Sequence, residues 1–501
     1  MASNRVFIAI DLGAESGRVM AAELRDERIH LREIHRFHHT VIELPTGLHW
    51  DLGGLWREIL AGLRAAATWS AENSHRIVSV GVDAWGVDWA LVGQNGELCG
   101  MPHAYRDPRN LAAYESVVGI LGVDLIYKIT GIQMMPINSL YSLYAQQRAD
   151  DRLFAAASRL LFIPDLMHFW LSGKWSCEKT IASTSQMIDV ATGNWASELL
   201  QPLGIRRDLF LPTCPPGTSI GTLTPEVCRA TGLGHNVSVV LPPAHDTASA
   251  VTAVPATGRS KWAYLSSGTW SLLGVELKQP CVNDAAQEAM FTNEAGVNNS
   301  IRFLKNIAGL WLVQQCRLDF LSSGQTTEAD SFDYQRLTQE AEICRPFQTL
   351  VNTRHPSFQS RGMMTEKINQ YARQTGQPIC ESTGQFVRCC LESLALEYRR
   401  TAGELEKTLA VTLEVLHVVG GGSQNQLLNQ MTANSMGIPV VAGPVEATAA
   451  GNALVQAMAA GDVSNLEHLR QIVANSSELR TYKPAETKIW GIQQGRYDSL
   501  P

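Results

Sequence analysis

Two stretches of this chain, one in each half, follow the same plan of an apolar strand, a short polar turn and a second apolar strand. The first is FIAIDLGAESGRVMAAEL, residues 7–24, and the second is KWAYLSSGTWSLLGVEL, residues 261–277. The second copy follows VTAVPATGRS, residues 251–260, whose Pro, Gly and Ser are typical of a linker. This repetition predicts two similar α/β halves with a cleft between them.

The size and charge of the chain exclude several classes of protein. With 501 residues it is too long for one hydrophobic core, since domains average about 150 residues. A net charge of −7, from 41 basic and 48 acidic residues, favours neither nucleic acid nor an anionic membrane as partner. The sequence has no run of 18 apolar residues and no signal-peptide pattern. The ten Cys show neither zinc-ligand nor disulfide-framework spacing, so we expect a reduced, cytoplasmic protein.

The other patterns predict strands mixed with helices. Residues 5–13, 18–24 and 29–37 read as three strands of an antiparallel meander. Asp51 is typical of a helix cap, because apolar residues follow it at helical spacing. The C-terminal part ends with an alternating unit: a helix around 391–405, a strand at 413–419, a helix at 423–431, a strand at 438–443 and a helix at 446–461.

Three glycines, Gly420 to Gly422, end the strand of this unit and open the helix after it. Backbone N–H groups can approach an anion closely at such a turn, and the helix dipole favours negative charge. The segment is neither a G-x-G-x-x-G nor a Walker A sequence. We interpret it as a contact for phosphate or nucleotide; the simpler alternative is a plain strand-to-helix turn.

The two repeated hairpins carry small polar residues that suit phosphates. In the first, Asp11 ends a strand and could hold Mg²⁺ through water, while the turn offers N–H and hydroxyl donors. In the second, Ser266, Ser267 and Thr269 repeat this chemistry. Either hairpin alone is more simply a polar turn, but with the glycine run they fit a nucleotide in an interdomain cleft.

The stretch PPAHDTASA holds one carboxylate, Asp246, with no obvious cationic partner. An Asp before Thr-Ala-Ser-Ala is most often a helix N-cap. A general base that accepts a proton from a hydroxyl is the rarer reading, and the local sequence leaves both open.

Eleven motifs in order along the chain resemble the FGGY family of carbohydrate kinases. They are AIDLGAESGR, DAWGVDWAL, YRDPR, TGIQMMPINSLY, IPDLMHFWLSG, HDTASAV, YLSSGTWSLLG, FTNEAG, LKNIAGLWLVQQ, VVGGGSQNQLLNQ and AGPVEATAAGNA. The resemblance implies the actin-like ATPase fold, an α/β fold of two ribonuclease-H-like domains: a sugar-binding domain over 1–250 and an ATP-binding domain over 258–501.

The resemblance also implies roles for residues at matching positions. Asp246 would be the catalytic base, and Asp11 the metal-associated carboxylate. The substrate residues would be Gly86, His245, Asp246, Thr247 and Asn306. The nucleotide residues would be Ala14, Glu15, Ser16, Gly17, Arg18, Thr269, Gln314 and Gly422.

The activity implied is ATP-dependent, Mg²⁺-assisted phosphorylation of the 1-hydroxyl of a deoxy-ketose, with L-rhamnulose as the expected sugar. Fuculose, another deoxy-ketose or xylulose is an alternative acceptor, and an actin-like ATPase with a conformational output is an alternative function. Three positions depart from the family pattern: Glu15, Ala295 and Ser423. The Glu15 carboxylate is expected to point away from the phosphates.

Overall fold

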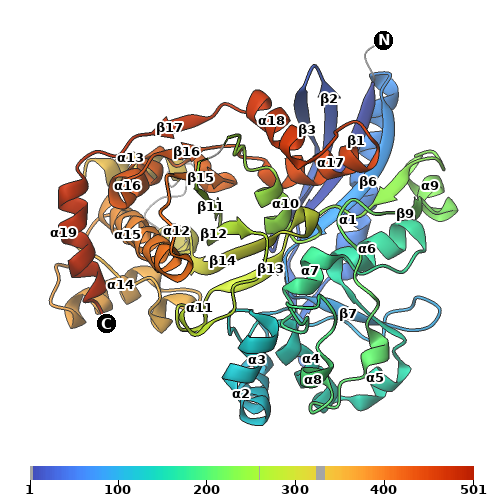
Figure 1. Ribbon diagram of the computed structural model, residues 1–501, viewed down its shortest axis with the longest axis horizontal. Helices are drawn as coiled ribbons and strands as arrows, with labels where there is room; N and C mark the ends of the chain where they lie inside the picture. The colour runs from blue at the N-terminus through green and yellow to red at the C-terminus, as the bar shows by residue number, and fades with distance from the viewer. Residues whose placement is uncertain (1–3, 259, 323–332) are drawn as a thin grey trace. The chain divides into compact units, whose positions relative to one another are not determined.

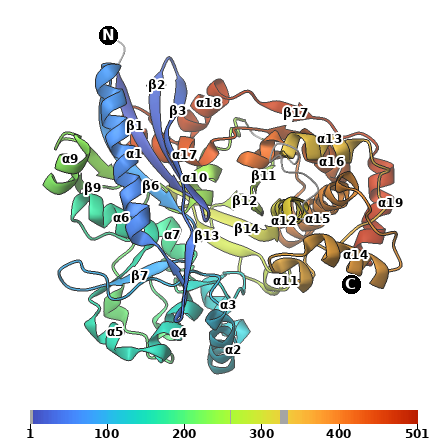
Figure 2. The ribbon, with the colours of Figure 1, turned by 180° about the vertical axis from the view of Figure 1, so that it is seen from behind.

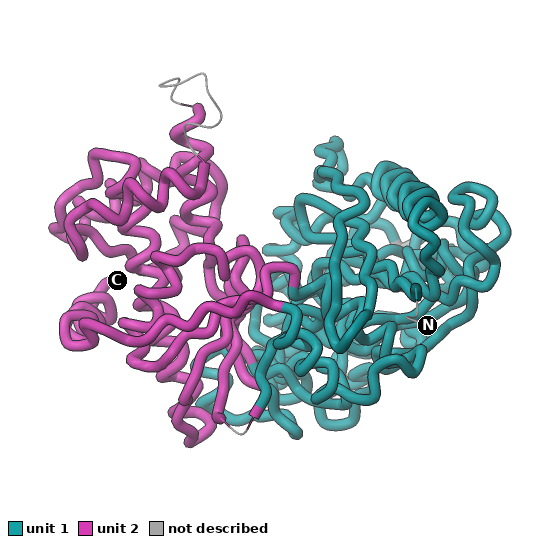
Figure 3. Tube along the Cα trace, turned by 90° about the horizontal axis from the view of Figure 1, so that it is seen from above, with its two compact units in different colours: residues 1–257, 276–303, 447–476 teal, residues 258–275, 304–446, 477–501 magenta. Residues whose placement is uncertain are grey.

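The computed structural model describes residues 4–258, 260–322 and 333–501. These residues form two compact units, coloured teal and magenta in Figure 3. Each unit is built from segments that are far apart in the sequence. Unit 1 comprises Met1–Thr257, Glu276–Phe303 and Ala447–Ser476, and unit 2 comprises Gly258–Val275, Leu304–Glu446 and Ser477–Pro501.

Unit 1 contains a six-stranded sheet with the order β3-β2-β1-β6-β10-β9. Its first three strands form the predicted antiparallel meander, and β1 pairs in parallel with β6. From Val6 onward every side chain of β1 is buried, as its apolar sequence requires. The strands of unit 1 are β1 (Arg5–Leu12), β2 (Ser16–Arg25), β3 (Arg28–His38), β4 (Val41–Leu44), β5 (Gly47–Trp50), β6 (Arg76–Ala84), β7 (Trp89–Val92), β8 (Arg159–Phe162), β9 (Ser219–Thr222), β10 (Ser238–Val240) and β13 (Thr292–Ala295).

Helices cover both faces of this sheet. Figure 1 shows α17 in front of it, and Figure 2, from behind, shows α1 in front. The predicted cap is confirmed, because Asp51 Oδ1 accepts the N–H of Gly54 at 2.8 Å. The helices of unit 1 are α1 (Leu52–Glu72), α2 (Arg109–Leu121), α3 (Val123–Thr130), α4 (Ser139–Ala149), α5 (Asp151–Ala156), α6 (Ile163–Ser172), α7 (Lys179–Ser183), α8 (Ser197–Leu200), α9 (Pro225–Thr231), α10 (Asp246–Thr252), α11 (Asp284–Glu288), α17 (Ala447–Ala459) and α18 (Leu466–Ser476).

A seven-stranded sheet has the order β13-β14-β12-β11-β15-β16-β17, and its strands from β14 onward repeat the plan of the first sheet. The β11–β12 hairpin takes the place of β1–β2, and β11 pairs in parallel with β15 as β1 does with β6. The repetition predicted from the two hairpin sequences is therefore confirmed in the strand order. These strands are β11 (Trp262–Ser267), β12 (Trp270–Leu277), β14 (Ile301–Ala308), β15 (Val415–Val419), β16 (Val440–Ala442) and β17 (Arg480–Tyr482).

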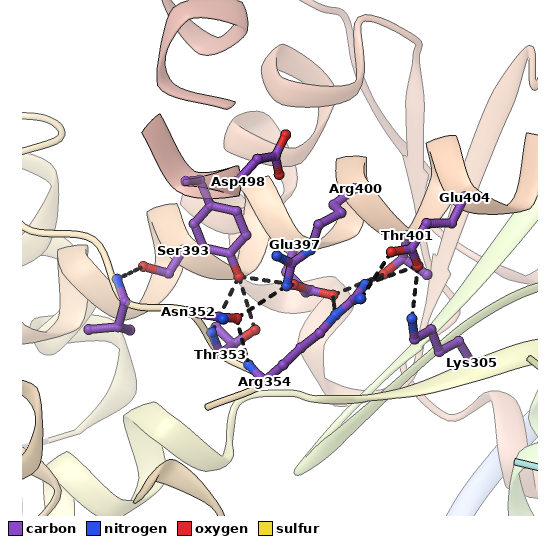
Figure 4. Close-up of polar contacts among 12 residues, drawn as sticks. Lys305, Asn352, Thr353, Arg354, Ser393, Glu397, Arg400, Thr401, Glu404 and Asp498 are labelled. Atoms are coloured by element: carbon purple, nitrogen blue, oxygen red, sulfur yellow. Dashed lines mark hydrogen bonds and ion pairs between the residues drawn. The ribbon is translucent and has the colours of Figure 1, made fainter. Parts of the chain in front are cut away.

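The longest helix of unit 2, α15, carries a partly buried ion network (Figure 4). It begins with a capping box in which Ser382 and Gln385 satisfy each other's backbone N–H groups. Further along, Glu397 and Glu404 both pair with Arg354. The helices of unit 2 are α12 (Trp311–Ser322), α13 (Tyr334–Glu342), α14 (Met364–Gln374), α15 (Thr383–Leu409), α16 (Gln426–Met436) and α19 (Thr487–Asp498).

The glycine run departs from the sequence prediction in one respect. Gly421–Gln424 form a 3₁₀ turn, and α16 starts only at Gln426, with the Asn425 side chain accepting the N–H of Leu428. The prediction of a helix opening directly at the glycines was wrong, because Asn425 is the stronger N-cap. Within the described chain, no helix combines the length and the apolar character needed to cross a membrane.

Candidate active site

Two carboxylates lie side by side at the carboxyl ends of β1 and β6. Asp11 and Asp83 are register partners in this parallel pair, and both are buried. Arg18, on β2, donates to Asp11 Oδ2 at 2.5 Å. Burial and the neighbouring Asp11 charge raise the pKa of Asp83 well above its usual range, although Asn452 Nδ2 donates to its Oδ2 at 2.5 Å. The other oxygen of Asp83 has no hydrogen-bond partner among the described groups.

Asp246 lies at the same edge of the sheet. The backbone before it is joined to β6 by a bridge between Ala84 and His245, and the Ala84 N–H donates to Ala244 O at 2.9 Å. Its side chain is 30% exposed. Burial raises its pKa, and the adjacent His245 opposes this effect. The site therefore holds a partly accessible carboxylate whose basicity is increased.

Asp246 is not the helix cap that its local sequence predicts. Helix α10 begins at Asp246, so His245 is the N-cap residue, with no side-chain cap bond. The N–H groups of Ala248 and Ser249 donate to the carbonyl oxygen of His245. Asp246 Oδ1 instead accepts the N–H of Thr247 at 2.5 Å and its hydroxyl at 3.1 Å. The cap prediction fails because the helix starts at Asp246 itself, one residue earlier than a cap at this position requires.

His245 contacts a buried ion pair on its other side. Glu294 and Arg302 lie 2.9 Å apart, and each is within 3.2 Å of His245 Nδ1. Burial would raise the pKa of Glu294, but Arg302 and His245 outweigh it, so this pKa is lowered. The loop before α10 is also held by Glu178, whose carboxylate accepts the N–H of Ala244 at 3.1 Å.

Gly86, two residues after the end of β6, lies next to the His245 ring. A Cβ on Gly86 would be 3.3 Å from His245 Nε2 and 3.4 Å from the Thr184 side chain. Behind it, the indole N–H groups of Trp50 and Trp85 donate to Asp88 at 2.6 and 2.8 Å. The backbone at Gly86 therefore approaches the imidazole too closely for a side chain to fit without displacing its neighbours.

The predicted nucleotide turn of unit 1 covers the end of β1. The Gly13 N–H donates to Ser16 O at 2.9 Å, which closes the turn, and Glu15 is exposed, as expected for a carboxylate directed away from phosphates. Ala14 and Ser16 are partly exposed, and Gly17 is buried. Arg18 connects this turn to Asp11, so the predicted metal residue and the predicted phosphate turn are neighbours.

The other predicted site residues belong to unit 2. Gln314 Nε2 donates to Thr269 Oγ1 at 3.2 Å, which joins α12 to the β11–β12 turn. Gly422 packs against Ser267 in the same hairpin. The structure thus brings together Thr269, Gln314 and the neighbourhood of Gly422. Asn306 lies on β14 and is half-buried.

Sequence reasoning missed four polar residues that contact this machinery. They are Asp83, Asn452, Glu294 and Arg302. Glu294 could have been recognised, because it is a charged residue within the short strand β13, whose side chains are all buried. A charged residue on such a strand needs a partner, and usually a functional reason.

Comparison with known proteins gives consistent matches over nearly the whole chain. The N-terminal domain model of the FGGY family of carbohydrate kinases matches residues 6–253, and its C-terminal domain model matches 263–460. A rhamnulokinase from Bacteroides thetaiotaomicron is 44% identical over 484 residues, covering 97% of both chains. A rhamnulokinase from Bacillus subtilis is 38% identical, covering 96% of both chains.

Solved structures share the fold at much lower identity. A xylulose kinase from Lactobacillus acidophilus matches with a TM-score of 0.82 at 16% identity, covering 99% of this chain and 97% of that one. Plasmodium falciparum glycerol kinase with ADP matches with a TM-score of 0.76 at 15% identity, covering 99% and 97%. The fold is the expected actin-like, ribonuclease-H-like α/β fold, and the chain belongs to the FGGY family of carbohydrate kinases.

Proposed function

We propose that this protein transfers the γ-phosphoryl group of ATP to the 1-hydroxyl of L-rhamnulose. The observation that carries the proposal is the full-length similarity to curated rhamnulokinases, 44% identical in the case of the Bacteroides protein. Solved kinases for xylulose and glycerol share the fold but only 16% and 15% of the sequence, so they favour no particular sugar.

Asp246 is the general base of the proposed reaction. Phosphoryl transfer requires in-line positioning, stabilisation of phosphate charge and a carboxylate that takes the hydroxyl proton. Asp246 is partly exposed, and burial raises its pKa, which makes it a stronger base than a free Asp. Asp11 and Asp83 are less suitable, because Asp11 is paired with Arg18 and Asp83 is fully buried.

The remaining predicted residues divide between the two reactants. Gly86, His245 and Thr247 would contact the sugar from residues 1–250, and Asn306 would contact it from β14. The close approach of the Gly86 backbone to His245 supports this assignment. ATP is the co-substrate of the family. Its phosphates would contact Ala14, Glu15, Ser16, Gly17 and Arg18 through the first turn, and Thr269, Gln314 and Gly422 through residues 258–501.

The carboxylates at the end of β1 and β6 fit a magnesium ion. Mg²⁺ prefers oxygen ligands and is usually held by one or two carboxylates together with substrate phosphates. Asp11 offers such a carboxylate, and Asp83 Oδ1 is a buried oxygen without a partner among the described groups. Within the described residues no group of three or more His, Cys, Asp or Glu could hold a metal without such phosphates. When bound with ATP, Mg²⁺ would neutralise β- and γ-phosphate charge.

A screen for ADP release over ketoses and polyols tests the proposal. L-rhamnulose is expected to stimulate the parent most strongly, and Asp246→Asn to lower kcat by about 10²- to 10⁴-fold. Asp26→Asn, at a side chain 88% exposed, is the matched control and should keep the parent rate. ADP release that no sugar stimulates would favour the conformational ATPase, and full activity of Asp246→Asn would exclude this base.

The cytoplasmic location expected from the sequence is also part of the proposal. It is supported by the ten cysteines, all of which carry free thiols in the described chain. Free thiols are usual in a reducing compartment.

A further inference from the structure

The imidazole of His245 lies between a buried ion pair and the proposed base. Arg302 Nη2 is 3.1 Å from its Nδ1, and Glu294 Oε2 is 3.2 Å from the same atom. On the opposite edge of the ring, Nε2 is 3.4 Å from Asp246 Oδ1. The side chain of His245 is 10% exposed, that of Glu294 6% and that of Arg302 1%. The ring is therefore held from both edges in a nearly dry environment.

The hydrogen bond from Arg302 identifies which ring nitrogen is free of a proton. A guanidinium group has only donors, so His245 Nδ1 must accept in the bond with Arg302 Nη2. The orientation of Arg302 is fixed independently, because its Nε donates to the carbonyl oxygen of Ala295 at 3.0 Å. In neutral His245 the proton must then lie on Nε2, which faces Asp246.

The other neutral tautomer is disfavoured chiefly at the Nε2 edge of the ring. A proton on Nδ1 could be donated to Glu294 Oε2, 3.2 Å away, but it would remove the acceptor for Arg302 Nη2, and the lone pair on Nε2 would face the Asp246 carboxylate. If His245 is protonated, Nδ1–H can donate to Glu294, and Nε2 still carries a proton. Both favoured states of His245 therefore present an N–H group to Asp246.

We propose that Arg302 and Glu294 are positioning residues that hold His245 with a proton on Nε2, so that His245 donates a hydrogen bond to the Asp246 carboxylate. The inference rests on the proposed function only for the role of Asp246 as base. A donor at this place stabilises ionised Asp246 against the cost of burial. It also prevents neutral His245 from taking the substrate proton itself. Glu294 balances the charge of Arg302, which would otherwise be costly to bury.

The position of the proton can be measured without any substrate. In protein labelled with ¹⁵N-histidine, two-bond ¹H–¹⁵N correlation spectra distinguish the Nε2–H tautomer from the Nδ1–H tautomer. The signal of His245 is assigned from its loss in His245→Gln and, independently, in His245→Asn. We expect the Nε2–H tautomer or the doubly protonated ring. A neutral ring with its proton on Nδ1 overturns the proposal.

The same two variants test the effect on catalysis. The amide nitrogen of Gln can take the place of Nε2, whereas that of Asn reaches only the place of Nδ1. Hydrogen bonds to charged groups are among the stronger ones, so we expect His245→Gln to keep a kcat about tenfold or more above that of His245→Asn. Equal losses in the two variants, with both folded by circular dichroism, contradict the proposal.

A control and a separate outcome keep the two proposals distinct. His468→Gln replaces a half-buried His in α18 that pairs with Glu27, and it should leave both the spectrum of His245 and the rate unchanged. If no sugar stimulates ADP release by the parent, the proposed function fails. The tautomer spectrum still decides whether His245 carries its proton on Nε2.

Discussion

Gly422 contacts Ser267 so closely that a Cβ on Gly422 would overlap the Ser267 hydroxyl and lie 3.1 Å from its carbonyl oxygen. Any side chain at residue 422 would therefore push the glycine run away from the β11–β12 hairpin. The adjacent Gly421 differs in this respect, because a Cβ there would meet no atom within 4 Å. Gly420 also approaches this hairpin, since a Cβ there would lie 3.1 Å from the Ser267 carbonyl oxygen, so Gly421 is the one glycine of the run that does not pack against Ser267.

This difference predicts opposite results for two neighbouring variants. Overpacking typically costs about 1–3 kcal/mol. If the run binds ATP as proposed, Gly422→Ala should raise KM for ATP by about an order of magnitude. Gly421→Ala should change it less than about twofold, and initial-rate kinetics with varied ATP provide the measurement. Equal KM values for the two variants would show that the run does not depend on the contact with Ser267.

A second glycine supports the helix that carries the proposed base. A Cβ on Gly451, in α17, would overlap the carbonyl oxygen of Ser249 in α10. Because α10 begins with Asp246, Gly451→Ala should displace the base, and a displacement of about 1 Å can lower kcat by about 10²-fold. Gly119→Ala, in α2, is the control, since a Cβ there meets no atom within 4 Å. Steady-state kcat at saturating sugar and ATP is the measurement, and an unchanged kcat in Gly451→Ala contradicts this role.

The sequence predicted features that depend on residues near one another in the chain. The β1–β2 and β11–β12 hairpins could be read from apolar runs and polar turns, and the cap at Asp51 from one residue before a helical pattern. The repeated strand order followed from the similarity of the two hairpins. Asp246 was located by its motif, although its place in the helix was not.

The features that could not be predicted depend on pairings across long stretches of chain. Nothing local to Arg302 shows that it reaches His245, 57 residues away, and nothing local to Asn452 shows that it donates to Asp83, 369 residues away. Each compact unit also contains segments that are distant in the sequence; Ala447–Ser476, for example, belong to unit 1 although residues on either side of them belong to unit 2. Such contacts are determined by the packing of the whole fold. The division into domains 1–250 and 258–501 remains a prediction about function.

Asp88 predicts a pH-dependent stability. Burial raises its pKa to about 7, although the indole N–H groups of Trp85 and Trp50 and a backbone N–H oppose this. Because the folded state then binds a proton that the unfolded state releases near pH 4, this contribution is present in full below about pH 4 and is lost as the pH rises toward 7. Between these limits, each rise of one pH unit lowers the contribution of Asp88 to the free energy of unfolding by about 1.4 kcal/mol.

Urea unfolding at about pH 5 and pH 7 measures this effect. The parent should lose about 2–3 kcal/mol more than Asp88→Asn over that interval. The Asn oxygen can still accept an indole N–H, so the variant is expected to fold. The comparison cancels the contributions of other buried carboxyls. If parent and variant lose the same free energy, Asp88 is already ionised at pH 5.

Glu404 connects the ion network of unit 2 to the strand that carries Asn306. In Figure 4 its carboxylate lies between Lys305 and Arg354; Lys305 Nζ is 2.8 Å from Oε2 and Arg354 Nη1 is 2.9 Å from Oε1. The side chain of Lys305 is buried, and burial lowers its pKa, with the Arg354 charge adding to this effect. Removal of one partner from a buried pair typically costs about 3–5 kcal/mol. Because the Glu404 side chain is 26% exposed, we expect Glu404→Gln to destabilise the protein by less than this, about 2 kcal/mol.

Two further variants separate the loss of this pair from a general loss of charge. Glu366→Gln removes a carboxylate from an exposed pair with Arg373, and it should cost less than about 1 kcal/mol. The double variant Lys305→Met with Glu404→Leu removes both charges and should be more stable than Glu404→Gln, because no buried ammonium loses its carboxylate. Urea unfolding gives the free energies. Equal destabilisation in Glu404→Gln and Glu366→Gln would show that the buried pair contributes no more than an exposed one.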